Sequence, residues 1–488
     1  MRRTTSKLRP VRMLLSVTMA AVLLAGCNRG EDAAPPAFTN ASVHDPSVIR
    51  VKDGTYYVFG SHLAAAKSDD LMNWQQIASG VKDGNPLIPN VTKELSETLE
   101  WAQADTLWAA DVIQLQDGKY YMYYNACRGD SPLSAMGIAV ASNIEGPYKD
   151  TGIILRSGMT GVSEDGTTYD ARVHPNVVDP DAFFDKDGKL WMVYGSYSGG
   201  IFMMELNPED GRPLPGQGYG KKLVGGNHSR IEGPYMLYSP DTDYYYLFLS
   251  FGGLDVRGGY HIRVVRSKSP DGPFLDAEGN DMINVKADPT RKLFDDDSIE
   301  PYGVKLMGNY RFRDPLDEGR KIGYVSPGHN SAYYDTETGQ YSLIFHTRFP
   351  AQGEMHEIRV HSFYFNAEGW PVVAPFRYAG APDSSVKRMN RDEVPGDYEL
   401  VNHGKEISAK IIQSVPIRLE EDGSVTGSVS GKWETDDGIQ LRLTIDGIDY
   451  DGVWLQAWDE KAQRWTQTFS VLSRQGVALW GARRNERG

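Results

Sequence analysis

Four acidic residues and one histidine stand at similar places in a repeated pattern of this 488-residue chain. They are Asp45, Asp111, Asp179, Glu232 and His329. In this order they precede the acidic residue of the next predicted turn by eight, six, eight, nine and eight positions. Carboxylates that crowd one site raise one another's pKa, so one can hold a proton at neutral pH while another stays ionised. Such an acid and base can together hydrolyse a glycosidic bond. Taken singly, each residue is better explained by an ordinary cap at the start of a strand, but five together favour a shared site.

Hairpins that recur five times would position these residues. Asp-Gly between alternating apolar residues is the strongest local signal for a β-hairpin, and a third strand follows most copies. The copies read "DPSVIRVKDGTYYVFGS", "ADVIQLQDGKYYMYYNA", "DPDAFFDKDGKLWMVYGS", "EGPYMLYSPDTDYYYLFLSFG" and "HNSAYYDTETGQYSLIFHTRF". Five such units predict an all-β fold with a five-bladed β-propeller; a β-sandwich is the alternative, and it would leave the repetition unexplained. Since the first strand of each propeller blade lines the central channel, we expect the five residues to meet at one mouth.

The pentapeptide "IEGPY" occurs twice, at Ile144–Tyr148 and at Ile231–Tyr235. Glu145 follows a third strand, in a turn whose pattern returns as "SKSPDGPFLD", where Gly and Pro supply the bend. Glu232 instead opens the first strand of the fourth unit. We therefore expect Glu145 to be structural and Glu232 to face the channel.

The N-terminal segment indicates export. Residues 1–26 combine a basic start with a short apolar stretch, which is typical of a secretory signal and too short for a transmembrane helix. "LAGC" resembles the lipobox of bacterial lipoproteins, which would make Cys27 a lipidated first residue that anchors the protein without spanning the membrane; ordinary signal cleavage is the alternative. Residues 27–40 would form a linker. Cys127 is then the single remaining cysteine, so no disulfide framework is expected.

The net charge of the chain without its signal indicates which kinds of molecule it could bind. Removal of the signal, which carries five basic and no acidic residues, changes the formal charge from −14 to −19. A strongly acidic protein is a poor candidate for binding nucleic acid, whereas a neutral polymer suits it. After the propeller at 41–382, residues 383–488 alternate and carry turn signals, which predicts a small β-barrel or sandwich. That domain could bind carbohydrate or buttress the propeller.

The motifs "HDPSV", "WAADV", "VVDPDAFFD", "IEGPY" and "SPGHNS" follow one another in an order that resembles glycoside hydrolase family 43, most closely its extracellular endo-α-1,5-L-arabinanases. The resemblance covers the propeller and the C-terminal segment. It implies that Asp45 is the general base, Glu232 the general acid and Asp179 a third carboxylate that raises the pKa of the acid, in an inverting reaction. Asp181 is a rival to Asp179, but the Asp-Pro context and the repeat favour Asp179.

Further contacts are implied by the same resemblance. His329 would face a calcium ion held largely by water; without the resemblance, a histidine bonded within a loop would be the simpler interpretation, because calcium prefers oxygen ligands. Ala110 departs from the family, which often has proline there, and this leaves a binding role for its neighbours less certain. The expected substrate contacts are His44, Trp108, Asp111, Ser196 and Tyr197.

The function that follows is cleavage of internal bonds in arabinan or a related plant cell-wall polysaccharide by a monomer, lipid-anchored at the cell envelope or extracellular. An exo-acting arabinofuranosidase or β-xylosidase of the same fold is one alternative, because loops at the channel mouth decide between internal and terminal cleavage. A surface lipoprotein that binds glycans without cleaving them is another, although it would have no reason to keep both Asp45 and Glu232 at matched positions.

Overall fold

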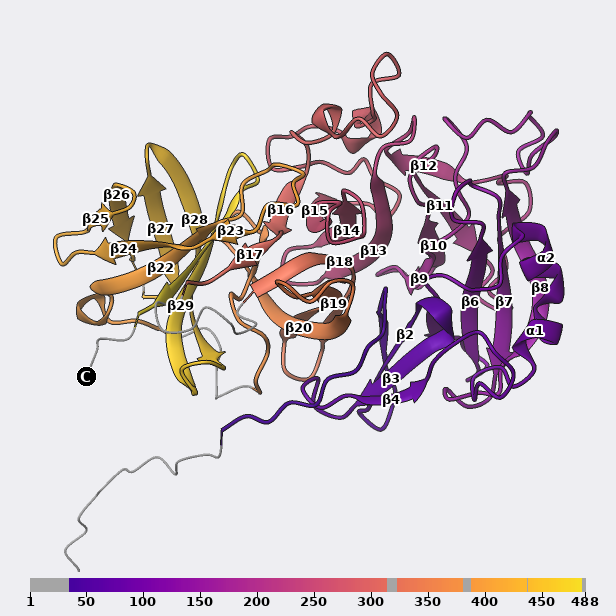
Figure 1. The fold of residues 1–488 in the computed structure, drawn as a ribbon, viewed down its shortest axis with the longest axis horizontal. Coiled ribbons are helices and arrows are strands. Elements are labelled where there is room, and N and C mark those ends of the chain that lie inside the picture. Colours follow the sequence, from indigo (N-terminus) through magenta and orange to yellow (C-terminus); the bar gives the residue numbers. More distant parts are fainter. Residues whose placement is uncertain (1–34, 314–322, 381–387, 437, 485–488) are drawn as a thin grey trace, which may run out of the picture. The chain divides into compact units, whose positions relative to one another are not determined.

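The computed structural model describes residues 35–313, 323–380, 388–436 and 438–484 (Figure 1). The signal and the lipidation site expected at Cys27 lie outside the described residues. Within the described ranges, no helix is both long and apolar enough to cross a bilayer. Two residues of the expected linker already contact the fold, since Thr39 bridges to Asn73 and the guanidinium of Arg377 lies 3.4 Å from the ring centre of Phe38.

Five sheets form the first and larger part of the chain, and their strands pair antiparallel in sequence order, with one exception among the described strands at the edge of the fifth sheet. Blades 1 and 2 contain β1 (Ser47–Arg50), β2 (Tyr56–Gly60), β3 (Ala64–Ser68) and β4 (Gln75–Ala78), then β5 (Asp111–Gln114), β6 (Tyr120–Cys127), β7 (Ser134–Ala141) and β8 (Lys149–Ser157). Blade 3 contains β9 (Asp181–Phe184), β10 (Leu190–Tyr194), β11 (Ile201–Leu206) and β12 (Lys221–Val224). Blade 4 contains β13 (Ile231–Ser239), β14 (Tyr244–Phe251), β15 (His261–Ser267) and β16 (Val304–Met307).

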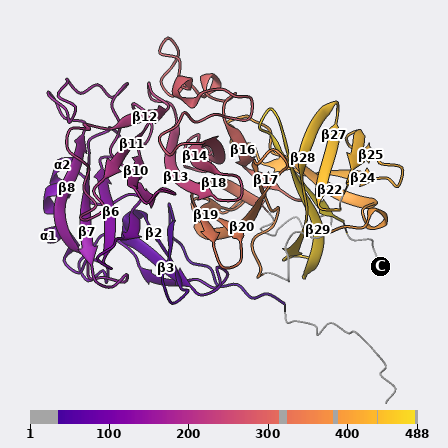
Figure 2. The same cartoon turned by 180° about the vertical axis from the view of Figure 1, so that it is seen from behind.

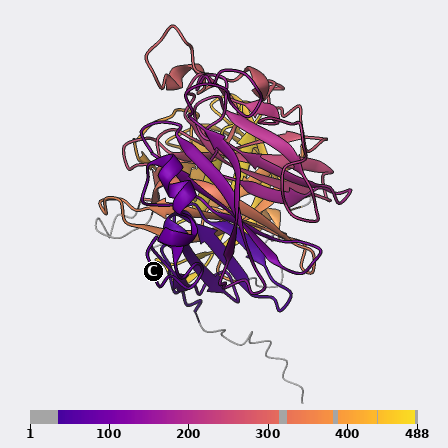
Figure 3. The same cartoon turned by 90° about the vertical axis from the view of Figure 1, so that its right-hand side faces the viewer.

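Blade 5 is larger than the others. It contains β18 (Gly323–Asp335), β19 (Gln340–Arg348), β20 (His356–Phe365) and β21 (Pro371–Val373), extended by the short strands β17 (Tyr310–Arg311) and β23 (Ile412–Gln413). The exception is β23, which pairs parallel with β17. The first strands of the blades contact one another in the cyclic order β1, β5, β9, β13, β18 and back to β1. This closure makes the structure a five-bladed propeller, and Figure 3 shows the indigo to magenta sheets of the first blades fanning out.

The hairpins form where the turn chemistry predicts them. In blade 1, Gly54 has φ +98°, which glycine adopts without strain, and the backbone N–H of Thr55 donates to the Asp53 side chain at 3.0 Å. The aromatic second strands of the blades are buried almost throughout, as a strand packed on both faces must be. The aromatic enrichment of the chain is therefore mainly core.

Two connections carry short helices. Between β4 and β5 lie α1 (Val91–Glu94) and α2 (Ser96–Ala102). Between β15 and β16 lie the 3₁₀ turns η2 (Met282–Asn284) and η3 (Asp296–Ser298). Two more 3₁₀ turns in the described part of the chain are η1 (Ser61–Leu63) and η4 (Arg391–Glu393).

The C-terminal part is a closed barrel of eight strands (orange to yellow in Figures 1 and 2). Its strands are β22 (Gly396–Asn402), β24 (Val415–Leu419), β25 (Ser424–Gly427), β26 (Gly431–Glu434), β27 (Gln440–Ile445), β28 (Ile448–Asp459), β29 (Arg464–Ser473) and β30 (Ala478–Arg483). Large side chains, among them Trp433, Trp454 and Phe469, fill its interior. Trp480 packs outward into the core of blades 4 and 5, 5.1 Å from the ring of Tyr310. These contacts favour a buttress over a carbohydrate-binding module.

Candidate active site

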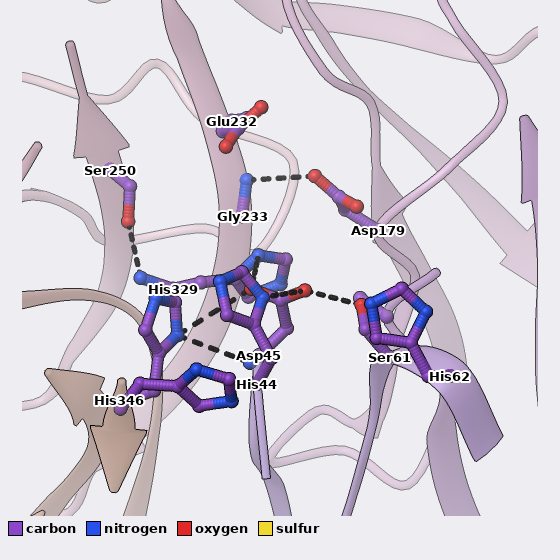
Figure 4. A network of polar contacts seen from close by, with 12 residues as sticks. His44, Asp45, Ser61, His62, Asp179, Glu232, Gly233, Ser250, His329 and His346 are labelled. Carbon is purple, nitrogen blue, oxygen red and sulfur yellow. Dashed lines mark hydrogen bonds and ion pairs between the residues drawn. The ribbon is translucent and has the colours of Figure 1, made fainter. Parts of the chain in front are cut away.

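A cavity of about 320 Å³ lies at the ends of the innermost strands, and residues of all five blades line it. This volume is at the lower end of the range typical of small-ligand sites. Figure 4 shows its polar floor with the residues behind it: His44, Asp45, His329 and His346 gather there, and the backbone nitrogen of Gly233, next to Glu232, faces Asp179. The expected acid, base and third carboxylate therefore share one cavity, which they line together with His44, Trp108, Ser196, Tyr197 and His329.

The backbone at this floor is strained. Asp45, Asp179 and His329 have φ values of 57°, 56° and 41°, in the left-handed region that non-glycine residues seldom adopt. Asp45 and Asp179 are each followed by proline, which disfavours the right-handed helical conformation of the preceding residue, and aspartate tolerates the left-handed alternative better than most residues. Each such residue costs about 1–3 kcal/mol, so the rest of the blade must stabilise it, and strain of this kind gathers at functional sites.

Asp45 is surrounded by donors. Oδ2 accepts a hydrogen bond from the Ser61 hydroxyl and lies 2.8 Å from His44 Nδ1, while Oδ1 lies 3.1 Å from His329 Nδ1. Burial by itself would raise the pKa of Asp45, but the charges and hydrogen bonds of His329 and His44 hold it well below the usual range. Asp45 is therefore ionised at neutral pH, the state that a general base requires.

A second layer of blade 5 side chains supports Asp45 from behind. The Asp45 backbone N–H donates to His346 Nδ1 at 3.1 Å, and burial keeps the pKa of His346 well below its ordinary value, so this ring is neutral. Arg348 places its terminal nitrogens 3.4 Å from His44 Nε2 and 3.5 Å from His346 Nε2, and its Nε donates to Glu354 at 2.5 Å. This arrangement leaves His44 Nδ1 facing the carboxylate of Asp45.

Glu232 has the opposite electrostatic character. Its two oxygens accept hydrogen bonds of 2.8 Å from the hydroxyls of Ser196 and Tyr260. Burial raises the pKa of Glu232, and the negative charge of Asp45 raises it further, although His329 and the two hydroxyls act against the shift. A buried carboxyl with a raised pKa is suited to donate a proton near neutral pH.

Asp179 is coupled to the same group. Its Oδ2 accepts the backbone N–H of Gly233 at 3.2 Å, one residue beyond Glu232. Burial, with the charges of Glu232 and Asp45, raises the pKa of Asp179 to about 7. The three carboxylates in turn raise the pKa of His329 to about 9, against the effect of burial. Asp179 and Glu232 thus compete for a proton, as two carboxyls that share a site must.

The second copy of the pentapeptide lies elsewhere. Glu145 does not line the cavity; its Oε1 accepts hydrogen bonds from Tyr57 at 3.0 Å and from Lys67 at 2.7 Å on the blade surface. The two glutamates of identical local sequence therefore have different surroundings, as the positions in the repeat predict.

Asp111 requires a correction. It does not line the cavity, so the expectation that all five residues meet at one mouth is wrong for this one. Asp111 Oδ1 accepts a hydrogen bond from the Ser47 hydroxyl at 2.5 Å, and Oδ2 accepts one from the backbone N–H of Ala182 at 2.9 Å. Burial raises the pKa of Asp111 to about 6 and that of Asp181 well above its usual value. Asp111 and Asp181, the rival to Asp179, therefore form a buried pair outside the lining of the cavity.

Several residues at the site had no sequence signal in the repeat. Tyr260, directly before β15, bonds the acid from behind the cavity lining. Cys127 and Asn176 line the cavity near Trp108, whose Nε1 donates to the Cys127 carbonyl at 3.1 Å. Leu293 and Phe294 also line the cavity. Two adjacent large apolar residues within the charged stretch "TRKLFDDDS" were the one signal that could have marked this part of the site.

The residues near His329 do not form an oxygen cage for calcium. Among the described residues, the single group of three metal-ligating side chains with ligand atoms within 4.8 Å of one another is His44, Asp45 and His346. Two imidazole nitrogens and one carboxylate fit a transition metal better than calcium, which takes six to eight oxygens. His329 offers one nitrogen that already faces Asp45. We therefore derive no catalytic step through calcium.

Comparison with known proteins places the chain in a family. The model of "Glycosyl hydrolases family 43" matches residues 36–296, and a "C-terminal lipocalin-like domain" matches residues 375–481. The chain belongs to glycosyl hydrolase family 43. It is 62% identical over 451 residues to an extracellular endo-α-(1→5)-L-arabinanase of Bacillus subtilis, and 54% identical over 460 residues to one of Thermotoga petrophila, covering 92% of this chain and 95% of each relative.

Solved structures agree with this assignment to family 43. A family 43 glycoside hydrolase from Bacillus licheniformis superimposes with a TM-score of 0.89 at 62% identity, covering 92% of this chain and all of that one. The fold of this relative is thus present along both the propeller and the barrel of the chain. The protein is a glycoside hydrolase, and the all-β architecture expected from the repeats is confirmed.

Proposed function

We propose that this family 43 hydrolase cleaves internal α-1,5-linked L-arabinofuranosyl bonds of arabinan with inversion at the anomeric carbon. One observation carries the proposal: a single cavity holds Asp45, which is ionised at neutral pH, together with Glu232 and Asp179, whose pKa values are raised. This division between a base and an acid is what glycosidic hydrolysis requires. The names of the two arabinanase relatives support arabinan as the substrate.

In the proposed reaction, Asp45 accepts a proton from water as that water attacks the anomeric carbon. Glu232 donates its proton to the glycosidic oxygen as the bond to the departing chain breaks. Ser196 and Tyr260 hold the two oxygens of Glu232 in place. We propose that Asp179, whose pKa the charge of Glu232 raises, in turn helps to keep the pKa of the acid high by repulsion, as the family resemblance implies. After the reaction Asp45 holds a proton and Glu232 is ionised, so one proton must pass back through solvent before the next turnover.

The proposed sugar contacts are His44, Trp108, Ser196 and Tyr197, all of which line the cavity. Calcium beside His329 stays a prediction that rests on the family resemblance; such an ion would take most of its ligands from water.

Export is proposed with the catalytic function, because both relatives are named as extracellular. Lipidation of Cys27 and a monomeric state are further proposals. Metabolic labelling with palmitate should tag the wild type and not the Cys27→Ala variant, and equal labelling would contradict the anchor. Size-exclusion chromatography with light scattering should give the mass of one mature chain.

Debranched arabinan tests the reaction directly. We expect short oligosaccharides as early products, seen by chromatography, and a product whose new anomeric centre is β when NMR spectra are recorded within the first minutes. Arabinose as the sole early product would indicate exo action, an α product would reject inversion, and binding without cleavage would reject the catalytic proposal.

A further inference from the structure

Three large apolar side chains form one wall of the cavity on blade 4, and we call them the blade 4 wall. Leu254 belongs to the connection between β14 and β15, and Leu293 and Phe294 belong to the connection between β15 and β16. Their exposed fractions are 37%, 63% and 41%. Single exposed apolar residues are common, but three from two separate connections beside buried carboxyls make a patch of the kind that marks a binding surface.

The connection that carries Phe294 is tied to the blade at several points. Arg230 Nε donates to Asp296 at 2.9 Å, and the Ala287 N–H donates to Ser229 Oγ at 2.8 Å. Asn227 Nδ2 donates to the Ala287 carbonyl at 2.8 Å. Phe294 itself has φ +60°, a strained value for a phenylalanine. The ring is therefore held at the cavity by its own backbone geometry and by an anchored connection, as a preorganised binding surface requires.

The wall lies on the side of the general acid. Ser196, which bonds Glu232, is followed directly by Tyr197, whose ring centre lies 5.7 Å from that of Phe294. The Tyr197 hydroxyl donates to the Gly252 carbonyl at 3.1 Å, at the end of β14 and two residues before Leu254. Contacts therefore lead from the acid to Phe294 and to the connection that carries Leu254, whereas Trp108 lines the cavity from blade 2.

We propose that the blade 4 wall binds an arabinofuranosyl residue of the departing chain, on the leaving-group side of the scissile bond. This inference rests on the proposed function. The acid must touch the glycosidic oxygen, and the departing chain begins at that oxygen, so its sugars lie on the side of Glu232. The C–H face of a neutral sugar packs well against an aromatic ring and aliphatic side chains. A surface for the departing chain favours cleavage within a polymer over removal of terminal sugars.

Arabinohexaose labelled at its reducing end tests the wall, because the length of the labelled product reports which bond was cut. Phe294→Ala should lower kcat/KM on this substrate about tenfold, equivalent to about 1.4 kcal/mol of transition-state binding. The labelled product should also become shorter, because weaker binding of the departing side lets more sugars occupy the other side. Phe294→Gly should behave in the same way. Because glycine adopts φ +60° without strain, an effect that both variants share comes from loss of the ring and not from a change in backbone strain.

Ile283→Ala is the matched control. Ile283 lies on the same connection and is 41% exposed, as Phe294 is, but it does not line the cavity. Its kcat/KM and product lengths should equal those of the wild type, and thermal melting should show all three variants folded. Unchanged product lengths and kcat/KM in both Phe294 variants would overturn the wall while the wild type still cleaves arabinan. A wild type that cleaves no arabinan would instead overturn the proposed function.

Discussion

Replacing the glutamate in each copy of "IEGPY" gives the sharpest test of the site, because the same substitution is made in the same local sequence. Glu232→Gln removes the proton donor but keeps a carbonyl oxygen that can accept one of the two hydroxyl hydrogen bonds from Ser196 and Tyr260. It also removes a buried carboxyl whose pKa burial raises. These effects on stability oppose each other, so we expect a folded variant. General acid catalysis contributes about 10²–10⁴-fold, and kcat/KM on debranched arabinan should fall by that factor.

Glu145→Gln is the control. It removes an ion pair with Lys67, whose side chain is 32% exposed against 40% for Glu145, so solvent screening limits the loss of stability to about 1 kcal/mol or less. The hydrogen bond from Tyr57 can persist to the amide oxygen. Because this site lies outside the cavity, kcat/KM should stay within about twofold of the wild type, a barrier change of about 0.4 kcal/mol.

A second substrate separates loss of the acid from general damage. A 2,4-dinitrophenyl α-L-arabinofuranoside releases a phenolate that needs no proton, so Glu232→Gln should lose less than about tenfold on it. Initial rates of phenolate release and of reducing-end formation measure both substrates. Equal losses in the Glu232 and Glu145 variants, or an equal loss of Glu232→Gln on both substrates, would refute the assignment of the acid.

Two further outcomes follow from the electrostatics of the channel, and a third tests the calcium ion that the family resemblance implies. The value of kcat/KM should fall as the pH rises through neutrality, because the pKa of Asp179 is raised to about 7 and that of Glu232 is also raised. On the acid side kcat/KM should stay level down to about pH 4, because the pKa of Asp45 is lowered. A loss of activity with a midpoint near the histidine value of about 6.5 on the acid side would contradict this. The pKa of Asp111 is raised from 3.8 to about 6, so the contribution of its protonated form to stability is complete below pH 3.8 and is lost as the pH rises through 6. Between about pH 4 and 7 the free energy of unfolding of Asp111→Asn should therefore rise by up to about 3 kcal/mol relative to that of the wild type. A difference in melting temperature that does not depend on pH would disprove this. Chelation with EDTA should lower the melting temperature or slow turnover, with recovery on adding calcium, and no change in either would count against calcium beside His329.

Much of the fold was readable because its signals are local. Asp-Gly turns and alternating apolar residues specify each hairpin within some 20 residues, so five blades and a C-terminal β domain could be predicted without knowing how they pack. The strained positions of Asp45 and Asp179 also had a local mark, since each precedes proline. The two copies of "IEGPY" were separated by their place in the repeat alone.

Depth along the channel could be decided only by the tertiary structure. Asp111 precedes its turn by six positions, as Ser47 and Asp181 do, whereas Asp45 and Asp179 precede theirs by eight. An offset of two residues along a strand keeps a side chain on the same face, so the alternating pattern of the sequence cannot separate the two positions. The offset nevertheless moves the side chain about 6.6 Å along the strand and out of the cavity. The sequence determined which side chains face the channel. Closure of the five blades decided which of them meet, and it brought the blade 4 wall and the histidines of blade 5 to a site that no local pattern describes, because contacts between distant segments have no period in the sequence.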